Sequence, residues 1–170
     1  MHAVAHIGFS FFITSVLSYF FRPDYLALFL LVGIVSGIII DLDHIYWFYQ
    51  YHPEGASSIR EMIRIYLKDC KGDQRYSPRY HTWTHELLGI LLVGIFSIGV
   101  NFLFGIAWAH AVFVPYLGHV LLDTLSVGMK PFSPFSQRYV FIGLFKPRQS
   151  HILGVTIISI LGGILFLVAI

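Results

Sequence analysis

Histidines and carboxylates stand at short spacings in several separate parts of an otherwise apolar chain. The run GIIIDLDHIYW, residues 37–47, contains Asp41, Asp43 and His44, although the whole chain has only nine acidic residues. Ionisable side chains beside so apolar a run are costly unless they are paired or bound to a metal. The cluster is therefore a candidate metal site.

Two further pairs have helical spacing. His119 and Asp123 in GHVLLD, and His81 and His85 in HTWTH, are each separated by four residues, so each pair shares one helix face and could chelate one ion. Imidazoles and carboxylates without a thiolate suit zinc, manganese or iron and disfavour magnesium. We expect one or two divalent ions, with zinc first and manganese or iron as alternatives.

The composition indicates an integral membrane protein formed by a single domain, residues 1–170. Hydrophobic residues make up 56% and charged residues 12% of the chain, whereas soluble domains carry roughly a quarter charged residues. A net charge of +2 is too small to indicate a nucleic-acid partner. The single cysteine, Cys70, excludes an intramolecular disulfide.

The apolar segments predict an all-α, polytopic membrane helix bundle. A bilayer core about 30 Å thick needs about 20 apolar residues as helix. Five segments qualify, at about residues 4–21, 25–46, 84–104, 106–127 and 151–170. Pro23 disfavours a helical Arg22 and so ends the first segment. Membrane lipids are the expected surroundings of all five.

The long polar loop, residues 50–79, contains a predicted surface helix. Its apolar residues recur at helical spacing, at Ile59, Met62, Ile63, Tyr66 and Leu67. Its basic residues fall on another face, at Arg60, Arg64 and Lys68. This pattern predicts an amphipathic helix that lies on the membrane surface.

The basic residues predict the orientation in the cell membrane, that is, the inner or plasma membrane. Ten of the eleven lie in loop 50–79 or in the loop before the last segment, and Arg22 alone lies on the opposite side. Because cytoplasmic loops collect Lys and Arg, we expect the N-terminus to be cytoplasmic. The ionisable residues of the spans then all lie near the cytoplasmic face.

Other polar or aromatic residues have plainer interpretations. His110 stands alone in the middle of a predicted helix, and we interpret it as a helix-packing residue. Phe132 and Phe135 fit an interfacial aromatic anchor better than a substrate wall.

The ordered motifs resemble the YdjM-like family of membrane-bound metal-dependent hydrolases. They are an early histidine (His6), DLDH, THELL and GHVLLDTLSVGMKPFSPF, and together they extend over residues 1–136. More distantly, the family resembles the zinc-dependent phospholipase C and P1 nuclease group. The resemblance implies metal-site roles for His6, Asp41, Asp43, His44, His85, His119 and Asp123.

The third motif departs from the family pattern, which reads H-R-x-x-T-H-S. Aligning its T-H on Thr84 and His85 puts Tyr80 at the first histidine and His81 at the arginine. Either His81 binds metal from a shifted position or one ligand is missing. Glu86 replaces the serine and could be a ligand or a general base.

The expected activity is hydrolysis of a phosphoester in a lipid or other amphiphile by a metal-activated water. We expect one ion toward Asp41, Asp43 and His44. A second ion would lie toward His85, His119 and Asp123, with His6 on either. The general base is Asp43, Glu86 or another unligated carboxylate.

Two other functions use the same residues. A metal or proton transporter could pass its cargo through the cluster, although such sites usually lie at the midplane between inverted repeats. A non-catalytic protein could use the metal to clamp its helices and dock a partner through the polar loop. An open coordination position would favour catalysis, and a closed one would favour the clamp. Oligomeric state does not follow from the sequence.

Overall fold

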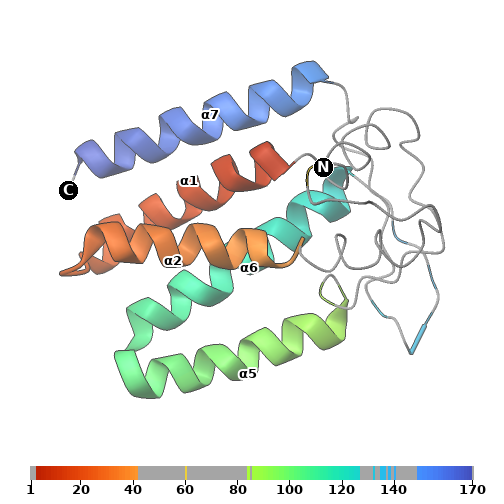
Figure 1. Ribbon diagram of the computed structural model, residues 1–170, viewed down its shortest axis with the longest axis horizontal. Helices are drawn as coiled ribbons and strands as arrows, with labels where there is room; N and C mark the ends of the chain where they lie inside the picture. Colours follow the sequence, from red (N-terminus) through yellow and green to blue (C-terminus); the bar gives the residue numbers. More distant parts are fainter. Residues whose placement is uncertain are drawn as a thin grey trace.

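The computed structural model (Figure 1) describes residues 3–41, 60, 84, 86–126, 132, 135–136, 138, 140 and 149–169. In these residues the structure has five helices: α1 (Ala3–Phe21), α2 (Leu26–Ile39), α5 (Leu87–Phe104), α6 (Ile106–Ser126) and α7 (Gln149–Val168). The described part of the chain contains no extended β-strand. The all-α helix bundle predicted from the sequence is confirmed.

Three of the helices, α1, α5 and α6, contain an apolar stretch long enough to cross a membrane. α2 and the Leu153–Val168 part of α7 are shorter apolar helices. α2 ends at Ile39, earlier than the predicted residue 46, because the chain turns at Ile40 and Asp41. Five complete spans thus stay a prediction. The predicted surface helix in loop 50–79 lies outside the described residues except for Arg60, which is helical and exposed.

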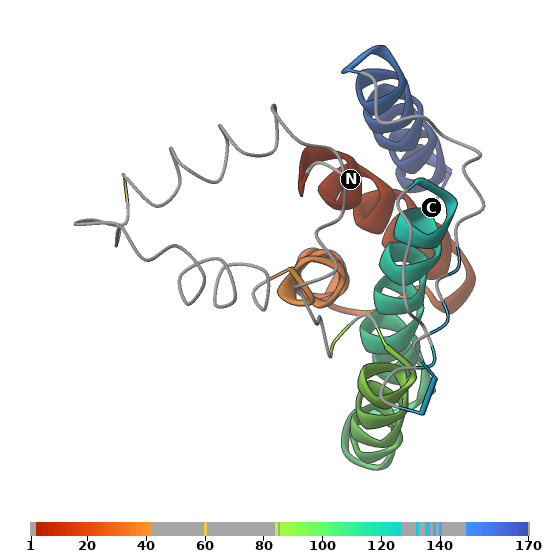
Figure 2. The same ribbon diagram turned by 90° about the vertical axis from the view of Figure 1, so that its right-hand side faces the viewer.

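Neighbouring helices run back and forth, and three of them form the centre. α1, α2 and α6 contact one another, while α7 packs on α1 and α5 packs on α6. Seen from the end of the bundle, α7, α1, α6 and α5 form a row with α2 on one side of it (Figure 2). The beginnings of α1, α5 and α7 therefore lie at the same end of the bundle as the ends of α2 and α6.

The turns between helices explain this alternation. Arg22 adopts a left-handed φ of 45° just after α1, before Pro23, and its N–H donates to the Ser18 carbonyl at 2.8 Å. Gly105 alone separates α5 from α6, with a φ of 90° that L-residues rarely adopt. Its N–H donates to the Asn101 carbonyl at 2.9 Å, which closes the last turn of α5.

Small residues bring α1 and α2 together. Gly33 and Gly37 are separated by four residues and face Thr14 and Ser10 of α1. A Cβ added at Gly37 would lie 2.7 Å from the Ser10 Cβ, and one at Gly33 would lie 2.9 Å from the Thr14 Cβ. Such spacing of small residues is typical of membrane helices that pack by close backbone approach.

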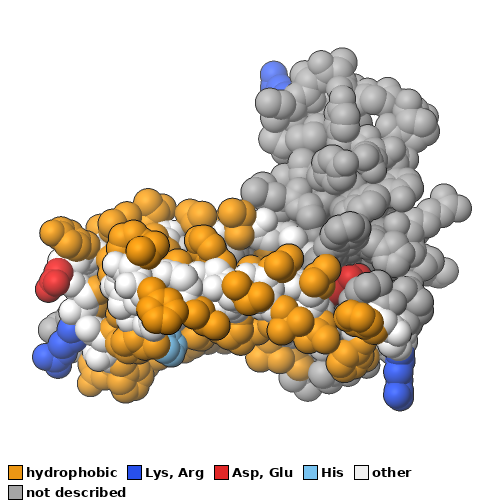
Figure 3. Space-filling view, turned by 90° about the horizontal axis from the view of Figure 1, so that it is seen from below, with side chains coloured by type: hydrophobic (Ala, Val, Ile, Leu, Met, Phe, Trp, Pro, Cys, Tyr) orange, Lys and Arg blue, Asp and Glu red, His pale blue; other side chains and the backbone are white. Residues whose placement is uncertain are grey.

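Hydroxyl groups of α1 lie inside the bundle, and many large apolar side chains lie on its outer face. Ser10, Thr14, Ser15 and Ser18 of α1 are all buried. Phe102 of α5, by contrast, is 82% exposed. Figure 3 shows apolar side chains over the helical body, with charged side chains near its ends. This distribution suits a lipid environment, where the outer face needs no polar cover.

Candidate metal centre

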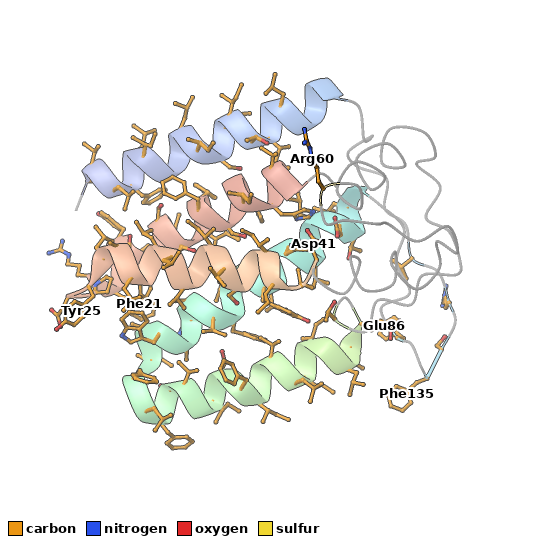
Figure 4. All side chains as sticks on the ribbon, in the orientation of Figure 1. Phe21, Tyr25, Asp41, Arg60, Glu86 and Phe135 are labelled. Atoms are coloured by element: carbon orange, nitrogen blue, oxygen red, sulfur yellow. The ribbon has the colours of Figure 1, made fainter. Side chains whose placement is uncertain are left out.

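The helix directions bring His6, Asp41, His119 and Asp123 to one end of the bundle. His6 lies in the first turns of α1, and Asp41 directly follows the end of α2 (Figure 4). His119 and Asp123 lie in the last turns of α6. Residues far apart in the sequence thus form one cluster, as the shared membrane depth of these motifs predicted.

The carboxylates of the cluster face its imidazoles. His6 Nε2 lies 3.1 Å from Asp123 Oδ1, and His119 Nε2 lies 3.4 Å from Asp123 Oδ2. His119 Nε2 also lies 3.3 Å from Asp41 Oδ1. Asp123 therefore contacts both histidines, while Asp41 reaches the same His119 nitrogen from α2.

The two imidazole rings are stacked. Their centroids are 3.6 Å apart and their planes are inclined by 10°. Both His6 and His119 are only 1% exposed. The stacking brings the Nε2 atoms of both buried imidazoles to the Asp123 carboxylate.

His6 provides the test of whether a metal fits. Its Nδ1 and Nε2 are both buried, and neither makes a hydrogen bond to the part of the chain that the structure describes. Nε2 faces Asp123 Oδ1 at 3.1 Å, a contact between two ionisable groups. Buried polar atoms normally have a partner. An ion near Nε2 would provide one for that nitrogen, so this residue fits a metal ligand.

His119 is held in one orientation by the backbone of α2. Its Nδ1 lies 2.5 Å from the Gly37 carbonyl oxygen. Because a carbonyl oxygen can only accept, Nδ1 must carry the proton and donate it. In a neutral imidazole this leaves the lone pair on Nε2, the nitrogen that faces Asp41 and Asp123. Metal-binding histidines are commonly oriented by such a bond on the other ring nitrogen.

The side chains of His6, Asp41 and His119 form a group that could hold an ion. One ligand atom from each lies within 4.8 Å of the other two. Two imidazoles and one carboxylate are a known catalytic zinc set, with a remaining position for water or substrate. The Asp41 side chain is 18% exposed and the Asp123 side chain 8%. Solvent therefore reaches this group mainly at Asp41.

The family comparison agrees with this membrane setting. The YdjM inner membrane protein family matches residues 1–169. The chain belongs to that family. No curated protein and no solved structure matches the chain. This YdjM-family chain is thus a membrane protein, and the more distant resemblance to the phospholipase C and P1 nuclease group stays a prediction.

Several predicted site residues of this YdjM-family chain lie outside the described residues. They are Asp43, His44, His81 and His85, and their metal-binding roles stay predictions. Thr84 and Glu86, which flank His85, are described. The Thr84 hydroxyl donates to the Ile40 carbonyl oxygen at 3.0 Å, so this part of the chain lies against the end of α2.

Glu86 lies at the same end of the bundle as Asp41 (Figure 4). It is 7% exposed and directly precedes α5, but its side chain does not cap that helix. Its proposed role as ligand or general base stays open.

Two features of this end of the bundle were not predicted from the sequence. They are the Gly37 carbonyl that orients His119 and the Tyr116 hydroxyl that donates to the Thr84 carbonyl oxygen. The spacing of Gly33 and Gly37 could have signalled a close helix contact in front of Asp41. No sequence signal marks Tyr116, since a tyrosine in a membrane helix is more often an interfacial anchor.

Proposed function

We propose that this YdjM-family chain is a membrane-embedded, metal-dependent hydrolase that cleaves a phosphoester in a lipid or other amphiphile. The observation that carries the proposal is His6, whose two buried ring nitrogens make no hydrogen bond to the described residues. Stacked on His119 and beside two carboxylates, it fits an ion better than a helix contact.

The described residues would have the following roles. His6, Asp41 and His119 would hold a divalent ion, preferably zinc. Asp123, whose oxygens face the same two Nε2 atoms, would bind this ion or a second one. A bound ion would polarise a phosphoryl oxygen and acidify water. Glu86, or Asp43 outside the described residues, would accept the proton of the attacking water.

The location of the cluster supports this substrate class. It lies at one end of an apolar bundle, and its most exposed member is Asp41. A phosphate group could reach this end while a hydrocarbon chain stays beside the exposed apolar side chains of the helices. The basic loops support a cytoplasmic N-terminus and hence a site at the cytoplasmic face.

Hydrolysis is tested with the purified protein in detergent, using p-nitrophenyl phosphoesters and short-chain phospholipids. Activity is expected to disappear with a chelator and return with zinc or manganese. Glu86→Gln is expected to lower kcat by about 10²- to 10⁴-fold, the usual contribution of general-base catalysis, with the bound metal unchanged. Loss of both metal and activity would make Glu86 a ligand instead.

The contradicting result is a metal-loaded wild-type protein that hydrolyses none of these substrates. Ion uptake by the same protein in proteoliposomes would then favour the transporter. His110→Ala is the matched control, because His110 lies on α6 with its Nδ1 2.8 Å from the Ile106 carbonyl oxygen, far from the cluster. Its activity should equal that of the wild type.

A further inference from the structure

A ring of hydrogen bonds joins α2, α6 and the residue Thr84. The Tyr116 hydroxyl donates to the Thr84 carbonyl oxygen, and the Thr84 hydroxyl donates to the Ile40 carbonyl oxygen at 3.0 Å. His119 Nδ1 donates to the Gly37 carbonyl oxygen at 2.5 Å. Ile40 directly follows α2 and is one turn from Gly37, and Tyr116 and His119 are one turn apart on α6. The ring therefore closes through one turn of each helix.

The ring is buried. Tyr116 is 2% exposed, and Ile40 and His119 are each 1% exposed. Tyr116 and Ile40 form an apolar cluster with Val120, against which side chains of α5 pack. The last carbonyls of a helix have no partner within it, so buried ones need donors from elsewhere. Thr84 provides such a donor at the end of α2.

Asp41 depends directly on this ring. It follows Ile40, and its own N–H donates to the Ile38 carbonyl oxygen at 2.9 Å. The turn that Thr84 holds therefore sets where the Asp41 side chain leaves the backbone. Across the ring, His119 Nε2 lies 3.3 Å from Asp41 Oδ1. Two candidate ligands from different helices thus belong to one hydrogen-bonded unit.

We propose that Tyr116 and Thr84 are positioning residues that hold the end of α2 against α6 and so set the distance between Asp41 and His119. In metal sites, hydrogen-bond partners that orient the ligands raise the affinity for the metal. The ring would have this effect on Asp41 and His119. The consequence for metal affinity rests on the proposed metal-dependent function, whereas the consequence for the end of α2 does not.

The test compares Tyr116→Phe and Thr84→Val, which each remove one hydroxyl, with Thr84→Ser, which keeps it. Tyr19→Phe is the matched control, because Tyr19 lies on α1 and packs edge-on against Phe166 of α7. In metal-free protein, amide hydrogen exchange at residues 38–41 should be faster in the first two variants only. Their dissociation constants for zinc should rise by about 10- to 100-fold.

Each outcome decides a separate part of the proposal. Unchanged exchange at residues 38–41 and unchanged zinc affinity in both variants would overturn it. A uniform rise in exchange over all helices with unchanged affinity would also overturn it, since that result marks a merely structural hydroxyl. If the wild type binds no metal, the proposed function fails and exchange at residues 38–41 alone decides on the ring. If Tyr116→Phe does not fold, Thr84→Val and its Thr84→Ser rescue decide.

Discussion

Replacing His119 with alanine is expected to abolish metal binding and any activity that depends on it. His119 contacts each of the other three residues of the cluster. It faces Asp41 and Asp123 through Nε2, stacks on His6, and donates to the α2 backbone through Nδ1. Alanine would remove one ligand and the contact that aligns the others. The loss of metal affinity should exceed the roughly 100-fold loss that follows removal of a residue that only orients a ligand.

The effect is measured by titrating zinc into the metal-free wild type and the variant, followed by calorimetry or a competing chelator. His110→Ala on the same helix is the control, because it lies nine residues away, about 14 Å along the helix. Its zinc affinity should match that of the wild type. If His119→Ala bound zinc within a few-fold of the wild type, His119 would not be a ligand.

Replacing Gly37 with alanine is expected to force α1 and α2 apart and to disturb the cluster where His119 bonds to the Gly37 carbonyl. The added Cβ would lie 2.7 Å from the Ser10 Cβ, a contact that rotation of the serine side chain cannot relieve. Overpacking of this kind costs about 1–3 kcal/mol of stability. Gly37 also presents the carbonyl that orients His119, and His6 lies one turn before Ser10 on α1. Metal affinity should therefore fall together with the thermal unfolding temperature.

Two variants separate this effect from a general effect of alanine. Gly99→Ala on α5 meets nothing within 4 Å and should leave both stability and zinc affinity close to those of the wild type. Ser10→Gly in the Gly37→Ala background removes the opposing Cβ and should recover much of both. A Gly37→Ala protein with the wild-type unfolding temperature would show that the two helices are not in close contact there.

The helical elements followed from the sequence because hydropathy and local breakers determine them. Pro23 correctly predicted where α1 ends, and the span predicted for residues 106–127 matches α6 closely. α2 was predicted too long, because the apolar run continues past Ile39 while the backbone turns at Ile40 and Asp41. Apolar composition indicates which residues lipid accepts, but a turn at a helix end depends on tertiary bonds such as the one from Thr84.

The sequence predicted which residues form the cluster but not how their side chains contact one another. Helix direction alone brings His6, Asp41, His119 and Asp123 to one end, and spacing alone puts the last two on one face. Asp41 and His119 were predicted to bind separate ions, whereas in the structure His119 Nε2 lies 3.3 Å from Asp41 Oδ1. The stacking of His6 on His119 and the bond from His119 to Gly37 depend on how the helices are offset along their axes. The spacing of residues within one helix does not determine that offset.

The measurement that tests the central claim most directly is the metal content of the purified protein by elemental mass spectrometry. The wild type and His6→Ala would be purified without chelators in the same detergent. About one or two equivalents of a transition metal, with zinc expected, should accompany the wild type. His6→Ala, which removes the imidazole whose nitrogens lack hydrogen bonds to the described residues, should carry much less. A metal-free wild type, or equal metal in both proteins, would contradict the account.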